Sequence, residues 1–194
     1  CSDRMVQPQA ALRRWQKLSV IGWLWSVVSS LILQKVESMI NVLFVCMGNI
    51  CRSPMAEAVF KHMVEEAGLS NQFQIDSVGT ISYHVGEPTH PGTQRVLAAH
   101  GIRSHSISRQ ITPIDLAEAD YVIVMDRDNL QDLKSMARRT PLNGRLHLLL
   151  EFAADPPTLE VPDPYYNGSF EKVYQLVESG CRGLLAHIRA EHHI

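Results

Sequence analysis

"INVLFV" at residues 40–45 runs directly into "CMGNICRSP" at residues 46–54, and this junction decides the fold. The first stretch is a continuous apolar run rich in β-branched residues, which is typical of a strand buried on both faces of a parallel sheet. The second stretch holds a Gly-Asn turn followed by Ser53 and Pro54. Serine is a favoured helix N-cap and proline is favoured at the first helical position, so a helix is expected to begin there.

The chain downstream alternates between helix-like and strand-like segments. Apolar residues recur at every fourth position from Met55 to Ala67, and Gly68 then ends this first helix. Strands alternating with helices indicate a parallel sheet covered on both faces, and such a sheet binds its ligand beyond the carboxyl ends of its strands. The sequence therefore predicts an α/β fold with four strands. The further strands are expected at 73–80, 120–126 and 145–152, and the further helices within 90–101 and from 170 onwards.

The composition favours a single globular domain and excludes some classes of protein. The 194 residues are 45% hydrophobic, which suits a proper core, and they carry a formal net charge of −2. This charge, without a polybasic run, gives no electrostatic reason to expect a nucleic-acid partner. Four cysteines without a CxxC pair do not make a disulfide framework in a chain of this length, so a reducing compartment is expected.

Residues 1–38 differ from the rest of the chain. The basic "LRRWQK" (12–17) precedes "LSVIGWLWSVVSSLIL" (18–33), an apolar run of 16 residues that contains four serines. The run is shorter than the roughly 20 residues that a bilayer span needs, and it resembles the apolar region of a signal peptide. Upstream translated sequence before a natural start at Met39, an export signal or membrane anchor, and an extra packed helix all stay open. We therefore separate an N-terminal extension at 1–38 from a folded domain at 39–194.

Cys46 and Arg52 carry the reactive chemistry of the loop after the first strand. Backbone N–H groups of a loop that leads into a helix N-terminus can point inward and hold an anion, and Gly48 allows the backbone shape this requires. Arg52 can bind two oxygens of a tetrahedral anion at once. The same positive field stabilises a thiolate, so Cys46 is expected to be a nucleophile to which Ser53 can donate a hydrogen bond. A zinc site with Cys51 is disfavoured because no second Cys/His pair has ligand spacing.

Seven stretches of the chain form a recognisable series, in order and at plausible spacings. They are "VCMGNICRSPMAE" (45–57), "DSVGT" (76–80), "HVGEP" (84–88), "HGI" (100–102), "SRQI" (108–111), "MDRDN" (125–129) and "DPYY" (163–166). Together they resemble the low-molecular-weight protein tyrosine phosphatases over residues 39–190. The resemblance implies a flavodoxin-like four-stranded parallel sheet with helices on both faces and a phosphate loop after the first strand. It also implies hydrolysis of phosphotyrosine monoesters without a metal or other cofactor.

The resemblance implies a role for each residue of the site. Cys46 would attack phosphorus and form a cysteinyl-phosphate, Arg52 would bind the equatorial oxygens, and Asp163 would protonate the leaving phenolate and later deprotonate water. Asp155 in "ADPP" is the local alternative for the acid, and only the two tyrosines that follow Asp163 favour the latter. The residues expected to surround the phosphate are Met47, Gly48, Asn49, Ile50, Cys51, Arg52 and Ser53.

Supporting roles follow from the same resemblance. Asn49, Ser77 and His105 would hold the loop in shape by hydrogen bonds. Ile50 stands where related arginine phosphatases carry threonine, so it favours phosphotyrosine. Cys51 would capture oxidised Cys46 as a disulfide before further oxidation. The residues expected to line the substrate pocket are Met47, Ile50, Tyr83 and Tyr165.

Alternatives to a cytoplasmic, monomeric phosphatase stay open at this point. An arsenate reductase on the same fold needs two further redox cysteines, and residues 82–180 contain none. A phosphate-binding module without turnover is expected to lack one of the three catalytic residues, yet all are present. An anchor at 18–33 would place the enzyme at a membrane. The expected partner is a phosphotyrosine protein or a small aryl phosphate, and Tyr165 and Tyr166 are themselves phosphorylation candidates.

Overall fold

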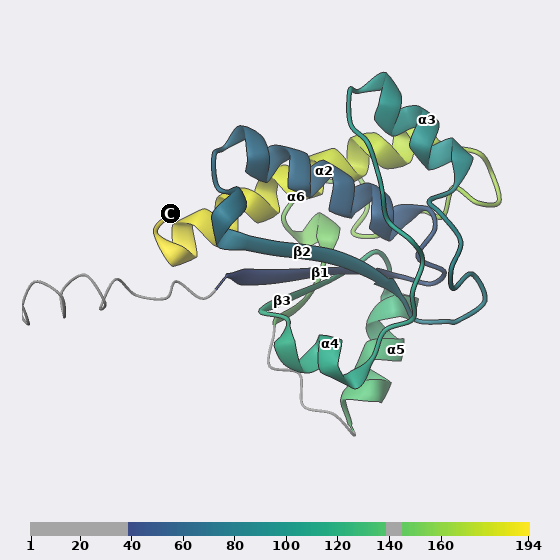
Figure 1. Ribbon diagram of the computed structural model, residues 1–194, viewed down its shortest axis with the longest axis horizontal. Coiled ribbons are helices and arrows are strands. Elements are labelled where there is room, and N and C mark those ends of the chain that lie inside the picture. Colours follow the sequence, from purple (N-terminus) through teal and green to yellow (C-terminus); the bar gives the residue numbers. More distant parts are fainter. Residues whose placement is uncertain (1–38, 139–144) are drawn as a thin grey trace, which may run out of the picture. The chain divides into compact units, whose positions relative to one another are not determined.

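The computed structural model describes residues 39–138 and 145–194, which form an α/β domain (Figure 1). The interpretations of residues 1–38, including the anchor at 18–33, lie outside the described residues. Within the described ranges, no helix is long and apolar enough to cross a membrane. The elements are β1 (Ile40–Cys46), α2 (Arg52–Glu66), η1 (Ser70–Gln72), β2 (Phe73–Gly79), α3 (Pro91–Ala99), α4 (Pro113–Glu118), β3 (Tyr121–Val124), α5 (Arg127–Ala137), β4 (Arg145–Leu148), η2 (Leu149–Glu151) and α6 (Phe170–His192).

The four strands form one parallel sheet in the order β2-β1-β3-β4. β1 lies between β2 and β3, so that Val42 is opposite Ile75 on one side and Tyr121 on the other. Because all neighbouring strands run in the same direction, their carboxyl ends meet at one edge of the sheet. The chain leaves β1 at that edge after Cys46. The predicted four-stranded parallel sheet is confirmed.

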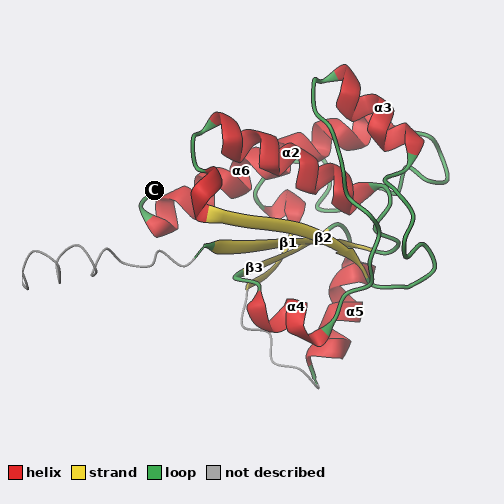
Figure 2. Cartoon of the chain, in the orientation of Figure 1, coloured by secondary structure: helices red, strands yellow, loops and turns green. Residues whose placement is uncertain are grey.

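Helices cover both faces of the sheet, as predicted (Figure 2). α2, α3 and α6 lie over one face, and α4 and α5 lie over the other. Alternate residues of β1 point to the two sides: Phe44 packs with α2 and α6, whereas Leu43 and Val45 pack with α4 and α5. This double burial explains why β1 is an uninterrupted apolar run in the sequence.

α6 approaches the segment after β4 very closely at Gly183. A Cβ atom at this position would lie 1.7 Å from the carbonyl oxygen of Phe152, so no larger residue fits without a backbone shift. An interior helix glycine costs about 1 kcal/mol relative to alanine, and the close approach is what requires it here. The apolar residues along the centre of α6 are buried. They are Val173, Val177, Cys181, Leu184 and Ile188.

The start of the first helix differs from the prediction. α2 begins at Arg52, and Cys51 occupies the N-cap without a side-chain capping bond. Ser53 was expected as the N-cap, but its hydroxyl lies 3.1 Å from the sulfur of Cys46 instead. The structure therefore places this serine in the loop's chemistry rather than at the end of the helix.

Several other elements differ from the prediction in length or existence. β3 is shorter than the expected 120–126, and α5 was not among the expected helices. β4 ends at Leu148 instead of continuing to residue 152, because Leu149–Glu151 turns into a 3-10 helix. α4 was not predicted, although Thr112 and Asp115 form a reciprocal capping box at its start. With six residues, this helix is too short to show an apolar period in the sequence.

Candidate active site

The loop between β1 and α2 wraps around the sulfur of Cys46. The backbone N–H of Asn49 donates to Cys46 Sγ at 3.3 Å, and the hydroxyl of Ser53 lies 3.1 Å from the same sulfur. Asn49 has a φ of 54°, in the left-handed region that asparagine adopts more readily than most residues. Donors that converge on one sulfur stabilise its thiolate form, so the loop geometry suits a nucleophile.

The end of β2 supports this loop from behind. A Cβ atom on Gly79 would lie 2.8 Å from the carbonyl oxygen of Met47, so only glycine lets the strand come this close. The next two backbone N–H groups, of Thr80 and Ile81, donate to the carbonyls of Cys46 and Met47 at 2.9 and 3.1 Å. The stretch "DSVGT" thus fixes the path of the chain just after the nucleophile.

Arg52 is the buried cation of the site. Its side chain is 4% exposed, and its guanidinium donates to Asp126 at 2.5 Å and to Asp163 at 2.8 Å. It also donates to the carbonyl of Val161 at 3.2 Å, which ties the loop that precedes Asp163 to the site. Burial lowers the pKa of Arg52, but the nearby Cys46, Asp163 and Asp126 outweigh burial and raise it overall. Arg52 is therefore a permanent cation beside the sulfur.

Cys46, Arg52 and Asp163 line one pocket at the carboxyl edge of the sheet. Asp163 is 23% exposed at its side chain and accepts the backbone N–H of Tyr165 at 3.0 Å, which holds the carboxylate in place. Asp155, the alternative acid, is exposed and does not line this pocket. The remaining residues of the lining are Met47, Gly48, Ile50, Cys51, His84, Tyr165 and Tyr166.

Cys51 faces the same pocket but differs in its chemistry from Cys46. Burial raises the pKa of Cys51 to about 12, with smaller contributions from the negative charges of Asp163 and Cys46. This thiol stays mostly protonated near neutral pH, so Cys51 is a weaker nucleophile and a weaker metal ligand than a thiolate. Among residues 39–138 and 145–194, no group of three or more His, Cys, Asp or Glu side chains is placed to hold a metal ion.

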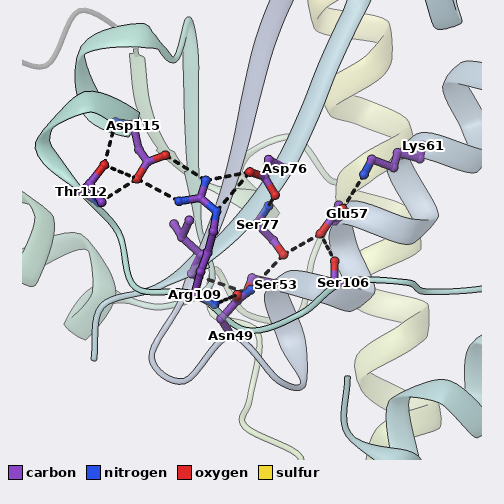
Figure 3. A network of polar contacts seen from close by, with 11 residues as sticks. Asn49, Ser53, Glu57, Lys61, Asp76, Ser77, Ser106, Arg109, Thr112 and Asp115 are labelled. Atoms are coloured by element: carbon purple, nitrogen blue, oxygen red, sulfur yellow. Dashed lines mark hydrogen bonds and ion pairs between the residues drawn. The ribbon is translucent and has the colours of Figure 1, made fainter. Parts of the chain in front are cut away.

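Asn49 is held by hydrogen bonds on both sides of its amide (Figure 3). Its Nδ2 donates to the hydroxyls of Ser53 and Ser77, each at 2.9 Å. Its Oδ1 accepts the backbone N–H of Arg109 at 3.0 Å, and the Arg109 side chain is itself clamped between Asp76 and Asp115. The structure thus brings Asn49, Ser53 and Ser77 together as an interlocked support for the loop.

Comparison with known proteins identifies the family. A sequence model described as "Low molecular weight phosphotyrosine protein phosphatase" matches residues 41–193. The chain is 46% identical over 156 residues to the low molecular weight protein-tyrosine-phosphatase YfkJ of Bacillus subtilis, covering 79% of this chain and 98% of that protein. The chain belongs to the low molecular weight phosphotyrosine protein phosphatase family. It is a protein-tyrosine phosphatase, a phosphoric monoester hydrolase, as the sequence predicted.

Other relatives of the phosphatase agree in sequence and in structure. PtpA of Staphylococcus aureus, also named a low molecular weight protein-tyrosine-phosphatase, is 41% identical over 151 residues, which covers 77% of this chain and 94% of PtpA. The crystal structure of YfkJ matches with a TM-score of 0.76 over 79% of this chain and 97% of YfkJ. The structure of DARP, a Drosophila arginine phosphatase, matches at 35% identity and a TM-score of 0.73, covering 76% and 97% of the two chains.

The pocket wall of the phosphatase differs from the prediction at one position. Tyr83 was expected there, but its side chain is 82% exposed and it does not line the pocket. His84 lines the pocket instead, with its Nδ1 2.8 Å from the carboxylate of Glu87. The ring of Tyr83 packs edge-on against His84 at 4.8 Å between centroids, so it braces the wall from outside. Tyr83 and His84 lie in a turn, where no periodic pattern in the sequence tells which side chain faces the pocket.

The support of the loop also differs from the prediction, at His105. This residue is exposed and forms no hydrogen bond with any part of the chain that the structure describes. Its neighbour Ser106 points inward and donates to the carboxylate of Glu57, which also accepts from Ser77 (Figure 3). Sequence reasoning missed Glu57, although it lies four residues after Ser53, which puts both on the same side of α2.

Proposed function

We propose that this phosphatase hydrolyses phosphotyrosine monoesters through a cysteinyl-phosphate on Cys46, with Asp163 as general acid and base. The observation that supports this most strongly is that Cys46, Arg52 and Asp163 line one pocket, with two hydrogen-bonding groups aimed at the sulfur. Neither a metal nor another cofactor takes part in the proposed steps. Positioning and charge stabilisation of the transferring phosphoryl group supply most of the rate enhancement.

In the first step, the thiolate of Cys46 attacks phosphorus and the bond to the phenolic oxygen breaks. Arg52 and the backbone amides of residues 47–53 bind the three equatorial oxygens, and the phenolic oxygen takes a proton from Asp163. The carboxyl of Asp163 is well placed because it lines the pocket and is held by Arg52 at 2.8 Å. A guanidinium suits this role because its planar fork can bind two phosphoryl oxygens at once.

In the second step, Asp163, now a carboxylate, takes a proton from a water molecule that attacks the phosphorus. The bond between sulfur and phosphorus breaks, and inorganic phosphate and the Cys46 thiolate are formed. Ser53 lies 3.1 Å from Cys46 Sγ and donates to it as negative charge returns to the sulfur. One carboxyl group thus transfers a proton in opposite directions in the two steps.

The walls of the pocket support an aryl phosphate as the substrate. Ile50 and Met47 present apolar surface, and the rings of His84 and Tyr165, whose centroids lie 6.1 Å apart, also line the pocket. A phenyl ring gains apolar and aromatic contacts there that the short side chain of phosphoserine does not reach. Ile50 stands where related arginine phosphatases carry threonine, which further favours phosphotyrosine proteins and small aryl phosphates as partners.

Asn49 and Ser77 hold the phosphate loop in this proposal, and Cys51 protects Cys46 from irreversible oxidation. The family match at 41–193 supports a phosphatase domain at 39–194 with residues 1–38 as an extension. Cys46, Cys51 and Cys181 are free thiols, which supports a cytoplasmic location. Helices pack on both faces of the sheet of one chain, which supports a monomer.

The test is hydrolysis of para-nitrophenyl phosphate in the presence of EDTA. Wild type is expected to be active, Cys46→Ser inactive, and Asp163→Ala slower by about 10²–10⁴ because the proton transfers are lost. Asp155→Ala is the matched control, since this exposed aspartate lies outside the pocket, and it is expected to retain wild-type activity. Full activity of Cys46→Ser would overturn the proposal. An inactive wild type that still binds phosphate would instead point to a binding module.

A further inference from the structure

Glu57 is a buried carboxylate that the proposed mechanism does not use. It lies in α2 with 6% of its surface exposed, it does not line the pocket of Cys46, and Ser77 links it to Asn49 of the phosphate loop. Three donors converge on it: the hydroxyls of Ser77 and Ser106 on one oxygen and the ammonium of Lys61 on the other (Figure 3). Burying a carboxylate is unfavourable unless its partners compensate, so its place beneath the loop calls for an explanation.

A series of hydrogen bonds links Glu57 to the sulfur of Cys46 through Ser77, Asn49 and Ser53. The donor and acceptor of the bonds that Asn49 makes can be assigned. The backbone N–H of Arg109 can only donate, so the amide of Asn49 must turn its oxygen toward Arg109 and its Nδ2 toward the two serines. Nδ2 then donates to both Ser53 and Ser77 at 2.9 Å. Each serine oxygen accepts from Asn49, and each must send its own proton elsewhere.

Glu57 provides the acceptor that the proton of Ser77 needs. Ser77 is 2% exposed, and its hydroxyl donates to Glu57 at 2.6 Å. If no acceptor stood there, the Ser77 proton would turn toward Asn49 and compete with the Nδ2 donor, because a buried hydroxyl without a partner is unfavourable. The amide of Asn49 would then lose one of the bonds that hold its left-handed backbone.

We propose that Glu57 is a positioning residue for Cys46: by accepting the Ser77 proton it keeps Asn49 oriented, and Asn49 in turn fixes both donors to the sulfur. The backbone N–H of Asn49 reaches Cys46 Sγ at 3.3 Å. Because the Ser53 oxygen accepts from Asn49, the Ser53 proton is left to donate to Cys46 Sγ at 3.1 Å or to the carbonyl of Val78 at 3.3 Å. This inference rests on the proposed role of Cys46 as nucleophile. What matters in it is the ability of residue 57 to accept, not its charge.

The test is the rate at which iodoacetamide alkylates Cys46, read on the tryptic peptide 36–52 by fragmentation that separates Cys46 from Cys51, so that it does not depend on turnover. Glu57→Met keeps the length of the side chain but removes the acceptor. We expect alkylation about fivefold slower than in wild type at pH 6, the worth of about one hydrogen bond, and no difference in strongly alkaline solution, where thiols in general react as thiolates.

Three further variants distinguish a positioning role of Glu57 from a general contribution of its side chain to packing. Glu57→Gln retains an acceptor oxygen and is expected to restore wild-type alkylation. Ser106→Ala removes the other hydroxyl from the same carboxylate oxygen but does not touch the loop, so it is the matched control and is expected to behave as wild type. Ser77→Ala removes the hydroxyl that donates to Glu57, and this variant replaces Glu57→Met in the test if Glu57→Met fails to fold. It is expected to slow alkylation as Glu57→Met does.

Equal alkylation of Glu57→Met and wild type at pH 6 would overturn the inference. A loss that persists in alkaline solution, or an equal loss in Ser106→Ala, would do the same, since either would indicate a general disturbance of packing. Failure of the proposed function looks different: Cys46→Ser would then retain phosphatase activity, whatever the alkylation rates of the Glu57 variants.

Discussion

The two ends of the sheet each hold a cluster of charged and hydroxyl side chains. The two clusters differ in whether their members line a pocket or only bind one another. At the amino end, Tyr121 and Arg145 begin adjacent strands, and both bind Glu191 near the end of α6. At the carboxyl end, Arg52 holds Asp163 beside the sulfur of Cys46, and all three line a pocket.

Perturbed ionisation occurs at both ends and so does not by itself mark the active site. Hydrogen bonds from Arg145 and Tyr121 lower the pKa of Glu191 to about 2, a larger displacement than many catalytic carboxylates show. Burial and Glu191 raise the pKa of Tyr121. These groups satisfy one another and tie α6 to the sheet, whereas at the other end the loop leaves room for an anion. Position at the carboxyl edge of a parallel sheet distinguishes the functional cluster.

The largest expected effect comes from replacing one arginine at each end by lysine. Arg52→Lys should lower kcat/KM for para-nitrophenyl phosphate by about 10²–10³, because an ammonium cannot make the two parallel hydrogen bonds of a guanidinium to the phosphoryl oxygens. Arg145→Lys is the matched change at the amino end, and it should leave kcat/KM within about twofold. Similar losses in both variants would remove the distinction between the two clusters.

A smaller effect is expected for oxidation, where the two buried cysteines Cys51 and Cys181 can be compared. After limited peroxide treatment and then a thiol reductant, wild type and Cys181→Ala should regain most activity, because Cys51 traps the oxidised Cys46 as a reducible disulfide. Cys51→Ala should regain several-fold less. The recovered share in wild type should rise with pH, since burial raises the pKa of Cys51 to about 12 and its thiolate becomes more populated toward that value. Equal recovery of Cys51→Ala would argue against the disulfide.

The smallest effect concerns stability at the amino end. The folded-state pKa of Glu191 lies below its ordinary value of 4.5, so its contribution to stability is full above pH 4.5 and is lost as the pH falls toward 2. The group is close to the surface, so Glu191→Gln should lower the Tm by only about 2–4 °C near neutral pH. The difference from wild type should shrink below pH 4.5, and kcat should not change. A Tm difference that is the same at both pH values would contradict this assignment.

The sequence was sufficient for the elements with a strong local signal. The apolar run of β1, the period of α2 and the left-handed Gly68 are local features, and the structure has a strand, a helix and a turn there. The pocket contains Cys46, Arg52 and Asp163 because the carboxyl edge of a parallel sheet gathers loops that are far apart in the chain. Position in the fold thus predicted the place of Cys46 and Arg52, whereas Asp163 was predicted only from the resemblance of "DPYY" to the family.

The supporting residues were less predictable because their roles depend on which way a side chain faces. Ser104, Ser106 and Ser108 alternate inward and bond to Thr89, Glu57 and Gly48, whereas His105 and Ile107 between them are exposed. A shift of one residue in such a segment exchanges the two faces. The alternating serines of "SHSIS" were a usable signal for this. No local signal in the sequence shows that the hydroxyl of Ser53 contacts the sulfur of Cys46 and the amide of Asn49 instead of capping the helix. Tertiary contacts determine which of these interactions forms.

The most direct test of the central claim is to look for phosphate on Cys46. Para-nitrophenolate leaves without help from an acid, so Asp163→Ala should still form the covalent intermediate but be slow to hydrolyse it. The variant would be mixed with para-nitrophenyl phosphate, quenched in denaturant at mildly alkaline pH and digested with trypsin. We expect one added phosphoryl group on the peptide 36–52, located at Cys46 and absent from Cys46→Ser. Release of para-nitrophenol with no phosphoryl group on this peptide, or with one on another residue, would contradict it.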